Sequence, residues 1–512
     1  MRGPLAPTLV ALVLVLAAPA AGAVIRGKPG GSLLLGTNKA DRLAGGKGPD
    51  RIEAAFGGAD RVDCGGGHDL VSADLGDRVA ADCEIVSRRL SVDASTSPSG
   101  QHETAVEPDS FSFGSTVVAT FQLGRIESGA AVNIGTAVST DAGRTGRRAL
   151  LPSLTGASTP AGPERAASDP TVAYDAVHGV WLVGTLALET GTLSHVLVSR
   201  SQDGEHWTAP VTVATGPQLD KDWFVCDNGA TSPFRGRCYA TYTDDQKSWT
   251  VVQYSNDGGV TWSQPVKAAD FTVGTQPLVR PDGGLAIVSG DYNGEQGLTG
   301  SIVSLVSADG GSTFTRSIVS TLTAKGNDPL RAIALPSADI DPAGKMYAVW
   351  HDCRFHPGCS ANDLVLSTSS DGMLWTRPVR IALATRGVPV QAFLPGIVAD
   401  PNEQGHLGLL YGYWEPKTCP KACLLDIAFV TSADGGATWS APQELSPRPM
   451  RTAWLARSEG GRMVGDYFSS SFASGRFVAV FTLAVPPLAD GRFREAVFAA
   501  SLAAYPHPGR RR

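Results

Sequence analysis

An eight-residue phrase recurs along the chain and constrains its fold more than any other feature. The clearest copies are Ser255-Asn-Asp257-Gly-Gly-Val-Thr-Trp262 and Ser432-Ala-Asp434-Gly-Gly-Ala-Thr-Trp439. Four weaker copies occupy residues 139–146, 201–207, 307–314 and 369–375. Successive aspartates of the six copies are 62, 54, 52, 62 and 63 residues apart. This regular recurrence indicates repeated structural units of similar size.

Short segments of alternating hydrophobicity flank the phrase and predict β-strands. One such segment precedes most copies, at residues 195–199, 250–254, 363–367 and 426–430, and a proline opens the segment after them, at Pro210, Pro265, Pro378 and Pro442. Proline is tolerated on an edge strand, because its missing N–H has no ladder partner there. The chain also has 59 glycines and 34 prolines and no long helical periodicity. We therefore expect an all-β chain of four-stranded repeats, with the phrase between the third strand and the outermost fourth.

The phrase resembles the Asp box of the sialidase, or bacterial neuraminidase repeat (BNR), superfamily, which implies a β-propeller. An aspartate in a glycine-rich turn usually accepts hydrogen bonds from its own backbone, so we expect the box aspartates to be structural. After the last box, residues 463–469, 476–483 and 495–502 predict three more strands, and residues 89–94 are positioned to supply a fourth. That arrangement gives seven blades. The alternative, in which these strands complete the first blade, gives six.

The two ends of the chain carry segments that do not belong to this fold. Arg2, the apolar residues 9–18 and the small residues Ala21-Gly-Ala23 are typical of a signal peptide, so residues 1–23 are predicted to be removed on export. The alternative is an uncleaved N-terminal anchor. The apolar run is shorter than the roughly 20 residues of a membrane-spanning helix, and no later segment predicts a stable membrane span. Residues 506–512 form a basic tail. The predicted location is extracellular.

Residues 24–88 form a separate module that is rich in glycine and aspartate. Aspartates recur at Asp41, Asp50, Asp60, Asp69 and Asp77, and each is followed two residues later by an aliphatic: Leu43, Ile52, Val62, Val71 and Val79. The pattern resembles the nonapeptide repeats of RTX (repeats-in-toxin) proteins, which implies a parallel β-roll with these aspartates as Ca²⁺ ligands. The alternative is a flexible linker. The Asp-box propeller would then occupy residues 89–505.

Eight cysteines fall into four pairs that are close in sequence: Cys64 and Cys83, Cys226 and Cys238, Cys353 and Cys359, Cys419 and Cys423. Clustered, even pairing in an exported chain predicts local disulfides. The formal net charge of −6 and the lack of a basic stripe in the sequence argue against nucleic acid as a partner. The expected partner is a glycan or another extracellular polymer.

Propeller ligand sites normally lie where second strands end and first strands begin, and this region carries polar residues. Sialidases place a tyrosine nucleophile, an activating glutamate, an aspartate acid/base and three arginines there. The resemblance therefore implies six candidates: Tyr467, Glu415, Asp222, Arg125, Arg354 and Arg331. Arginine suits the clamp because its fork matches a carboxylate bidentately. One departure is plain, because no Arg-Ile-Pro motif precedes the first box.

Each candidate also has a structural interpretation: Arg354 pairs with Asp352, Tyr467 packs in the core, and Asp220 and Asp222 are solvated or bind a structural cation. Three functions remain open at this point. The first is an exo-sialidase-type glycoside hydrolase acting on extracellular glycans. The second is a non-catalytic carbohydrate- or protein-binding propeller. The third is a lyase or esterase, for which the sequence shows neither a nucleophile elbow nor a cluster of metal ligands.

Overall fold

The computed structural model describes residues 22–189, 193–294, 297–383, 390–415, 419 and 423–503. The predicted all-β class is confirmed: these residues form strands β1 to β38 and short 3₁₀ turns, with no α-helix among them. No helix of the described ranges is long and apolar enough to cross a membrane. Almost all of the predicted signal peptide and the whole basic tail lie outside the described residues.

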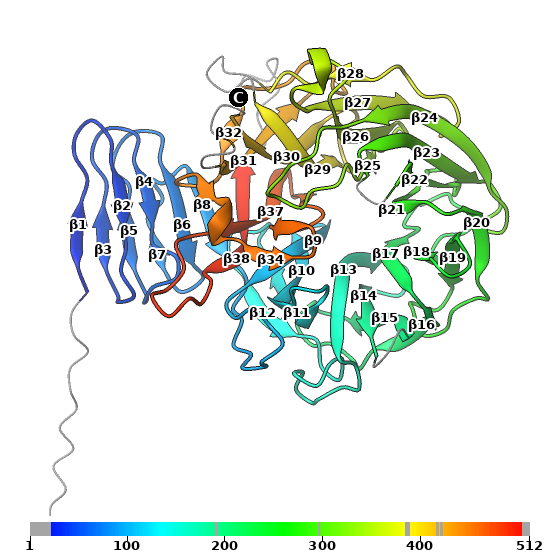
Figure 1. Ribbon diagram of the computed structural model, residues 1–512, viewed down its shortest axis with the longest axis horizontal. Coiled ribbons are helices and arrows are strands. Elements are labelled where there is room, and N and C mark those ends of the chain that lie inside the picture. The colour runs from blue at the N-terminus through cyan, green and yellow to red at the C-terminus, as the bar shows by residue number, and fades with distance from the viewer. Residues whose placement is uncertain are drawn as a thin grey trace, which may run out of the picture.

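Most of the chain forms a ring of antiparallel sheets (Figure 1). In the part of the chain that the structure describes, the antiparallel strands of this ring fall into seven groups of four, of which the first two are joined into one sheet by a single pair between the third and fifth strands of the ring. The first strand of each group lines the centre. In order, the groups are β9 (Ala105–Phe113), β10 (Thr116–Arg125), β11 (Ala131–Ser139) and β12 (Arg147–Leu150); β13 (Ala166–Asp175), β14 (Val180–Leu188), β15 (Leu193–Ser201) and β16 (Val211–Pro217); β17 (Leu219–Cys226), β18 (Cys238–Asp244), β19 (Trp249–Ser255) and β20 (Val266–Asp270); β21 (Val273–Val279), β22 (Leu285–Tyr292), β23 (Thr299–Ser307) and β24 (Thr315–Thr323); β25 (Ser337–Ile340), β26 (Met346–Asp352), β27 (Asp363–Ser369) and β28 (Val379–Arg380); β29 (Gln391–Ala399), β30 (Leu407–Trp414), β31 (Leu424–Ser432) and β32 (Gln443–Glu444); β36 (Ser469–Ala473), β37 (Arg476–Ala484), β38 (Glu495–Ala503) and β8 (Ile85–Arg89).

The last group takes its outer strand from the N-terminal part of the chain. β8 pairs antiparallel with β38, with Arg89 opposite Phe498, and parallel with β6 (Leu70–Asp74) on its other edge. The closing strand is therefore Ile85–Arg89, which begins four residues and ends five residues before the expected strand over residues 89–94. Ile85 and Ser87 are buried in this position, which fixes the register because a shift of one residue would turn them to the other face.

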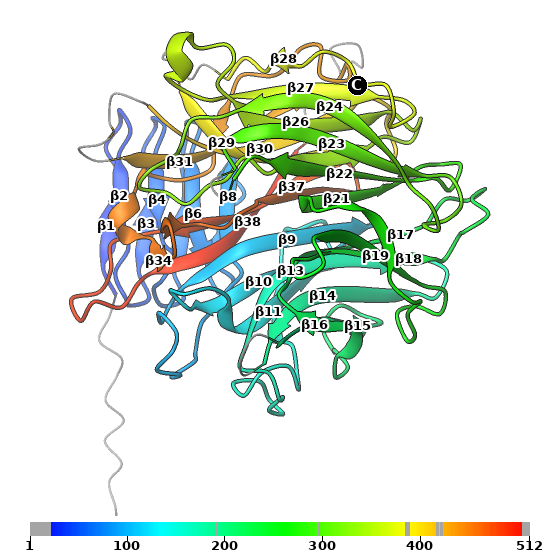
Figure 2. The ribbon, with the colours of Figure 1, turned by 45° about the vertical axis from the view of Figure 1, so that its right-hand side comes forward.

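Residues 22–89, which we call the N-terminal module, form two short parallel sheets beside the ring (Figures 1 and 2). One sheet contains β1 (Val24–Arg26), β3 (Arg42–Ala44), β5 (Arg61–Asp63) and β7 (Arg78–Val79), and the other β2 (Leu33–Leu35), β4 (Arg51–Glu53), β6 and β8. The aliphatic residues of the repeat pack between the two sheets. Leu43, Ile52 and Val62 are fully buried there, so the period of the sequence places one apolar side chain per turn in a common core.

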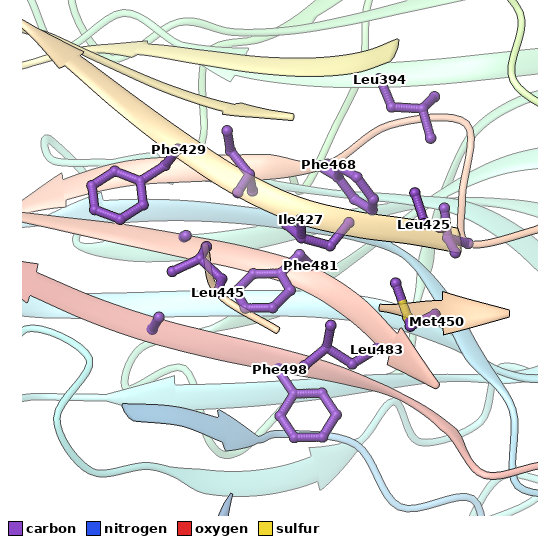
Figure 3. Close-up of a cluster of buried hydrophobic side chains, with 14 of the residues drawn as sticks. Leu394, Leu425, Ile427, Phe429, Leu445, Met450, Phe468, Phe481, Leu483 and Phe498 are labelled. Carbon is purple, nitrogen blue, oxygen red and sulfur yellow. The ribbon is translucent and has the colours of Figure 1, made fainter. Parts of the chain in front are cut away.

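An apolar cluster joins the module to the last two groups of the ring (Figure 3). Leu70 and Ile85 of the module pack with Phe429, Phe477 and Phe498. The rings of Phe429 and Phe477 are stacked with their centres 5.3 Å apart. Two ion pairs frame the contact, Arg51 with Glu444 and Arg448 with Glu53. The module is thus packed against the ring through a continuous core.

All four predicted disulfides are present, Cys64–Cys83, Cys226–Cys238, Cys353–Cys359 and Cys419–Cys423. The first closes the C-terminal end of the module, and the second joins the neighbouring strands β17 and β18.

The Asp boxes form tight turns in which the aspartate accepts the hydrogen bonds of its own loop. The Asp257 carboxylate accepts the Thr261 amide at 2.9 Å, the Thr261 hydroxyl at 2.6 Å and the Ser255 hydroxyl at 2.8 Å. The same bonds recur around Asp141, Asp309 and Asp434. Burial raises the pKa of Asp257, but the hydrogen bonds from Thr261, Ser255 and Val260 together outweigh it and lower the pKa to about 2. These contacts give the aspartates a structural role.

Replacing Asp257 with Ala is expected to lower the free energy of unfolding by about 1–2 kcal/mol at pH 7, because the four hydrogen bonds that its carboxylate accepts in the turn are lost. The pKa of a free aspartate is about 4. Because the folded pKa is lower, the contribution of Asp257 is present above pH 4 and is lost as the pH falls towards 2. Denaturant unfolding at several pH values checks this expectation. Asp270→Ala, an exposed carboxylate of the same sheet, is the control and should change little. An equal effect of both changes would contradict it.

Candidate functional site

The first strands of the ring share an unusual backbone feature at one end. Their pairing with the neighbouring strand shifts register, as at a β-bulge, in β9, β13, β17, β21 and β29. One residue at each bulge has a positive φ: Glu107 (52°), Asp169 (45°), Lys221 (53°), Gly274 (72°) and Leu394 (50°). A left-handed conformation costs a residue other than glycine roughly 1 kcal/mol or more. A bulge re-aims its side chain, and here three charged side chains are brought together.

These side chains meet around the ammonium group of Lys221. Its Nζ lies 2.6 Å from Asp466 Oδ2, 3.4 Å from Asp169 Oδ1 and 4.0 Å from Glu107 Oε1. The other oxygen of Asp466 lies 2.9 Å from the guanidinium of Arg331. We call these five residues the inner cluster. All but Arg331 are buried, so each carboxylate depends on its partners for stabilisation.

A second layer of polar groups fixes the inner cluster. The Gln122 amide donates to Glu107 and, at 3.0 Å, to the Ser168 hydroxyl. Arg125 donates at 2.9 Å to the Gln122 side-chain oxygen and at 2.9 Å to the Ser458 hydroxyl. Arg125 therefore acts on the cluster through Gln122 and is buried with it.

The carboxylates of this region differ in their affinity for a proton. Burial, with the charges of Asp169 and Asp466, raises the pKa of Glu107 to about 7, against the opposing charge of Lys221. Burial and the charge of Asp169 raise the pKa of Asp220 to about 7. Burial acts on Asp466 too, but the charges of Arg331 and Lys221 together lower its pKa. Near neutral pH, Asp466 is therefore ionised while Glu107 exchanges a proton readily.

Asp222 is the most isolated acid of the group. It is buried, and neither carboxylate oxygen has a hydrogen-bond partner in the described structure. Burial and the charge of Asp169 raise its pKa well above the usual value. Burial without a hydrogen-bond partner therefore favours the protonated form of Asp222.

A central cavity of about 670 Å³ begins at this end of the ring and is lined by the first strands of all seven groups. Asp466, Tyr467 and Trp223 contribute to its wall. The ring of Trp223 meets the ring of Tyr467 edge-on at 5.1 Å, and the Tyr467 hydroxyl donates to the Pro170 carbonyl at 3.3 Å. Burial and the charge of Glu107 raise the pKa of Tyr467 well above its usual value, so its hydroxyl keeps its proton.

The structure gathers four of the six residues that the sequence analysis selected. Arg331 belongs to the inner cluster, and Arg125 and Asp222 adjoin it. Tyr467 follows Asp466 directly, with Lys221 Nζ 5.8 Å from its ring centre. The other two, Arg354 and Glu415, are not among the residues of the inner cluster.

Arg354 makes its described contacts outside the inner cluster. Its guanidinium lies 2.6 Å from Asp352, which also accepts the Arg354 backbone amide at 2.8 Å. The short loop closed by Cys353 and Cys359 favours this local pair over a distant one. Glu415 directly follows β30 and is half-buried. Three arginines do not converge on Tyr467 in the described contacts, since Arg125 is bound to Gln122 and Arg331 to Asp466.

Glu107, Asp169 and Lys221 were not selected from the sequence. The sequence did contain a pattern that could have identified two of them. Glu107 and Asp169 each precede a proline near the beginning of a first strand, as do Leu335 and Leu394. A recurrent residue-proline pair at the same place in successive repeats marks an irregular strand end. Lys221 lies between Asp220 and Asp222, and its importance becomes visible only with the bulge in β17.

A ring of four-stranded antiparallel sheets with Asp boxes between third and fourth strands defines the class of protein to which this chain belongs. The model of the BNR repeat-like domain family matches residues 115–385, more than half of the sequence. The chain belongs to this family. A search of curated proteins found no match.

Solved structures with a related arrangement include three glycan-active proteins. The Hadza microbial sialidase Hz136 is 16% identical, with 79% of this chain and 66% of that chain covered and a TM-score of 0.44. The α-L-arabinofuranosidase Arb93A from Fusarium graminearum is 13% identical, with 64% and 92% covered and a TM-score of 0.44. The phage phi92 endosialidase is 10% identical, with 87% and 74% covered and a TM-score of 0.45. This chain thus spans slightly less than two thirds of the first.

Proposed function

We propose that the protein is a secreted, glycan-binding propeller of seven blades. The observation that carries this proposal is that the reactive groups at the inner cluster bind one another. Lys221 and Arg331 share Asp466, Arg125 is held by Gln122, and the Tyr467 hydroxyl donates to a backbone carbonyl. A sialidase-type reaction needs free arginines for the substrate carboxylate and an activated nucleophile. The geometry favours recognition over turnover.

The groups that remain partly accessible around the cluster suit a sugar. Trp223, Asp220 and Arg331 are half-buried, and Trp223 lines the cavity with Tyr467. The apolar face of a sugar ring packs on an aromatic side chain, while its hydroxyls bond to carboxylate and guanidinium groups. A bound sugar would be held between this aromatic pair and the two charged groups.

Trp223→Ala is expected to weaken glycan binding roughly tenfold or more, because a buried aromatic contact contributes on the order of 1.5–3 kcal/mol. Retention on a glycan array, followed by affinity measurement on the best ligand, checks this. Trp249→Ala is the matched control, since Trp249 is half-buried in the same sheet and does not line the cavity. A folded protein that binds no glycan on the array, or loses binding equally with both changes, would refute the proposal.

A second candidate, a glycoside hydrolase, is favoured by the contrast between Glu107 and Asp466. Both contact Lys221, yet their pKa values are shifted in opposite directions. Such a pair supplies the general acid and the ionised carboxylate of glycoside hydrolysis. Release of a fluorogenic leaving group from a sialoside or another aryl glycoside, abolished by Glu107→Gln, would establish this function. Glycan binding without any product would exclude it for the sugars tested.

The same proposal divides the chain into three segments with separate roles. Residues 1–23 direct export, residues 24–88 form an RTX-like β-roll, and residues 89–505 form the propeller, with β8 belonging to both. Export is supported by four disulfides, which persist in oxidising environments.

We propose further that the N-terminal module binds Ca²⁺ between its turns. Its aspartates form two columns, Asp41–Asp60–Asp77 and Asp50–Asp69, in which each backbone amide bonds to the carboxylate one step along the column. One oxygen each of Asp50, Asp60 and Asp69 is buried without a hydrogen-bond partner. Burial and the charges of Asp77 and Asp41 raise the pKa of Asp60 to about 6.

These features fit the chemistry of calcium. A buried carboxylate oxygen without a donor is unfavourable, and acids stacked in a column repel one another. A hard divalent cation relieves both problems and takes the oxygen ligands that this module offers. One ion would lie along the column of Asp41, Asp60 and Asp77 and another along the column of Asp50 and Asp69, each with support from the backbone carbonyls of the glycine-rich turns.

A further inference from the structure

The exposed sheet of the N-terminal module carries a ladder of arginines. In the parallel sheet β1-β3-β5-β7, Arg42 lies directly beside Arg61, and Arg61 directly beside Arg78. Successive side chains of a strand point to opposite faces, and Leu43 and Val62 point inward, so these arginines point outward. We call Arg42, Arg61 and Arg78 the arginine ladder. Arg26, two residues after the Val24 that pairs with Arg42, lies exposed on the same face.

The positive charge of this ladder is largely uncompensated. The side chains of Arg42 and Arg61 are 58% and 61% exposed, and both approach one carboxylate, Asp63, at 3.7 and 3.8 Å. Arg78 is exposed and has no ion pair within the described residues. Like charges directly beside each other destabilise a sheet, so the ladder does not serve folding.

The opposite sheet of the module shows the contrast. There the charged side chains are paired with the ring: Arg51 with Glu444, and Glu53 with Arg448 at 2.6 Å. Among the described residues, the module therefore pairs the charges of β4 with the ring, whereas on its free face Asp63 is the one carboxylate that approaches the ladder. A negatively charged partner on the free face would neutralise the arginine ladder, as the ring neutralises the charges of β4.

We propose that the arginine ladder binds an extended acidic polysaccharide. Neighbouring strands are about 4.8 Å apart, so the ladder presents guanidinium groups at an interval close to the length of one sugar residue. The fork of each guanidinium matches a carboxylate or sulfate bidentately. Strands β1, β3, β5 and β7 contain no aromatic residue on which nucleic acid bases would stack. This surface is separate from the inner cluster and does not depend on the ligand bound there.

The test uses the full chain with Ca²⁺ present and compares binding to polygalacturonate with binding to a neutral glucan. The variant Arg42→Gln/Arg61→Gln/Arg78→Gln keeps most of each side chain and removes three charges. Its affinity for polygalacturonate is expected to fall on the order of tenfold or more, since each exposed charge pair contributes modestly. The matched control, Arg144→Gln/Arg235→Gln/Arg377→Gln, removes three exposed arginines of the ring and should bind as the unchanged protein does.

Asp63→Asn is a second test, in which the affinity for polygalacturonate is expected to rise and not to fall. It removes the one carboxylate that competes for Arg42 and Arg61, so binding should become tighter and remain sensitive to salt. Three results would overturn the proposal. These are equal binding of the neutral glucan, unchanged binding by the ladder variant, and equal losses in the ladder and control variants. Attachment to anionic vesicles without attachment to polygalacturonate would likewise overturn it, because it would identify a membrane surface as the partner.

Discussion

Replacing Lys221 with Met is expected to lower the free energy of unfolding by about 3–5 kcal/mol near neutral pH, because a buried charge pair loses one partner. Lys221 lies 2.6 Å from Asp466 and 3.4 Å from Asp169, and all three residues are buried. Methionine fills similar space without a charge, so packing is retained while the carboxylates lose their cation. Urea unfolding measures the change. The control is Lys247→Met, because Lys247 is exposed and pairs with Asp244 at 2.7 Å within one turn.

The loss should depend on pH in a defined direction. Without Lys221, the folded-state pKa of Glu107 rises further, because an attractive positive charge has been removed. An acid whose folded pKa is raised contributes stability that is present at low pH and is lost as the pH rises through the folded pKa. The difference between the two proteins should therefore be smaller at pH 5 than at pH 8. A loss that is equal at both pH values, or equal to that of Lys247→Met, would show that Lys221 does not stabilise the carboxylates.

Removing Ca²⁺ is expected to destabilise the N-terminal module while leaving the far side of the ring folded. A ligand that binds only the folded state stabilises it by about 2.7 kcal/mol at a hundred times its dissociation constant. Thermal unfolding with millimolar Ca²⁺ and with a chelator measures this change, and Mg²⁺ should not replace Ca²⁺, because Mg²⁺ loses its water reluctantly.

Asp60→Asn should weaken the stabilisation by Ca²⁺, because one oxygen of Asp60 is buried without a protein partner. Asp63→Asn is the matched control, since its side chain lies on the outer face beside Arg42 and should leave the calcium response unchanged. An unfolding curve that is identical with Ca²⁺ and with chelator would reject the calcium proposal. A calcium response that survives Asp60→Asn would place the ion elsewhere.

Local patterns of the sequence predicted the parts of the fold that depend on near neighbours. The Asp boxes, the edge prolines, the aliphatic positions of the module and the disulfides between cysteines 4 to 19 residues apart all act over short distances. Their physical cause is contained within a few residues, as with the hydrogen bonds from Thr261 to Asp257. The all-β class follows from the same local information.

The inner cluster could not be obtained in this way, since it joins Glu107, Lys221 and Asp466 across most of the chain. Bulges in β9 and β17 turn Glu107 and Lys221 out of the normal alternation of side chains, which the two-residue period of a strand does not predict. Asp466 meets Lys221 from the segment before β36. Arg354 shows the opposite effect. As an arginine at the end of a second strand, Arg354 was a plausible ligand for a substrate carboxylate. In the structure it forms an ion pair with Asp352, two residues away in the sequence.

β8 is a strand of the N-terminal module that also forms the outer strand of the last group of the ring. Strand β38 is made some 400 residues after β8, and until the two pair, β38 leaves one edge of its sheet open. β8 can therefore close the ring only after the whole segment up to β38 has been synthesised. If calcium orders the module that contains β8, the arrival of the chain in a calcium-rich medium also determines when the ring can close.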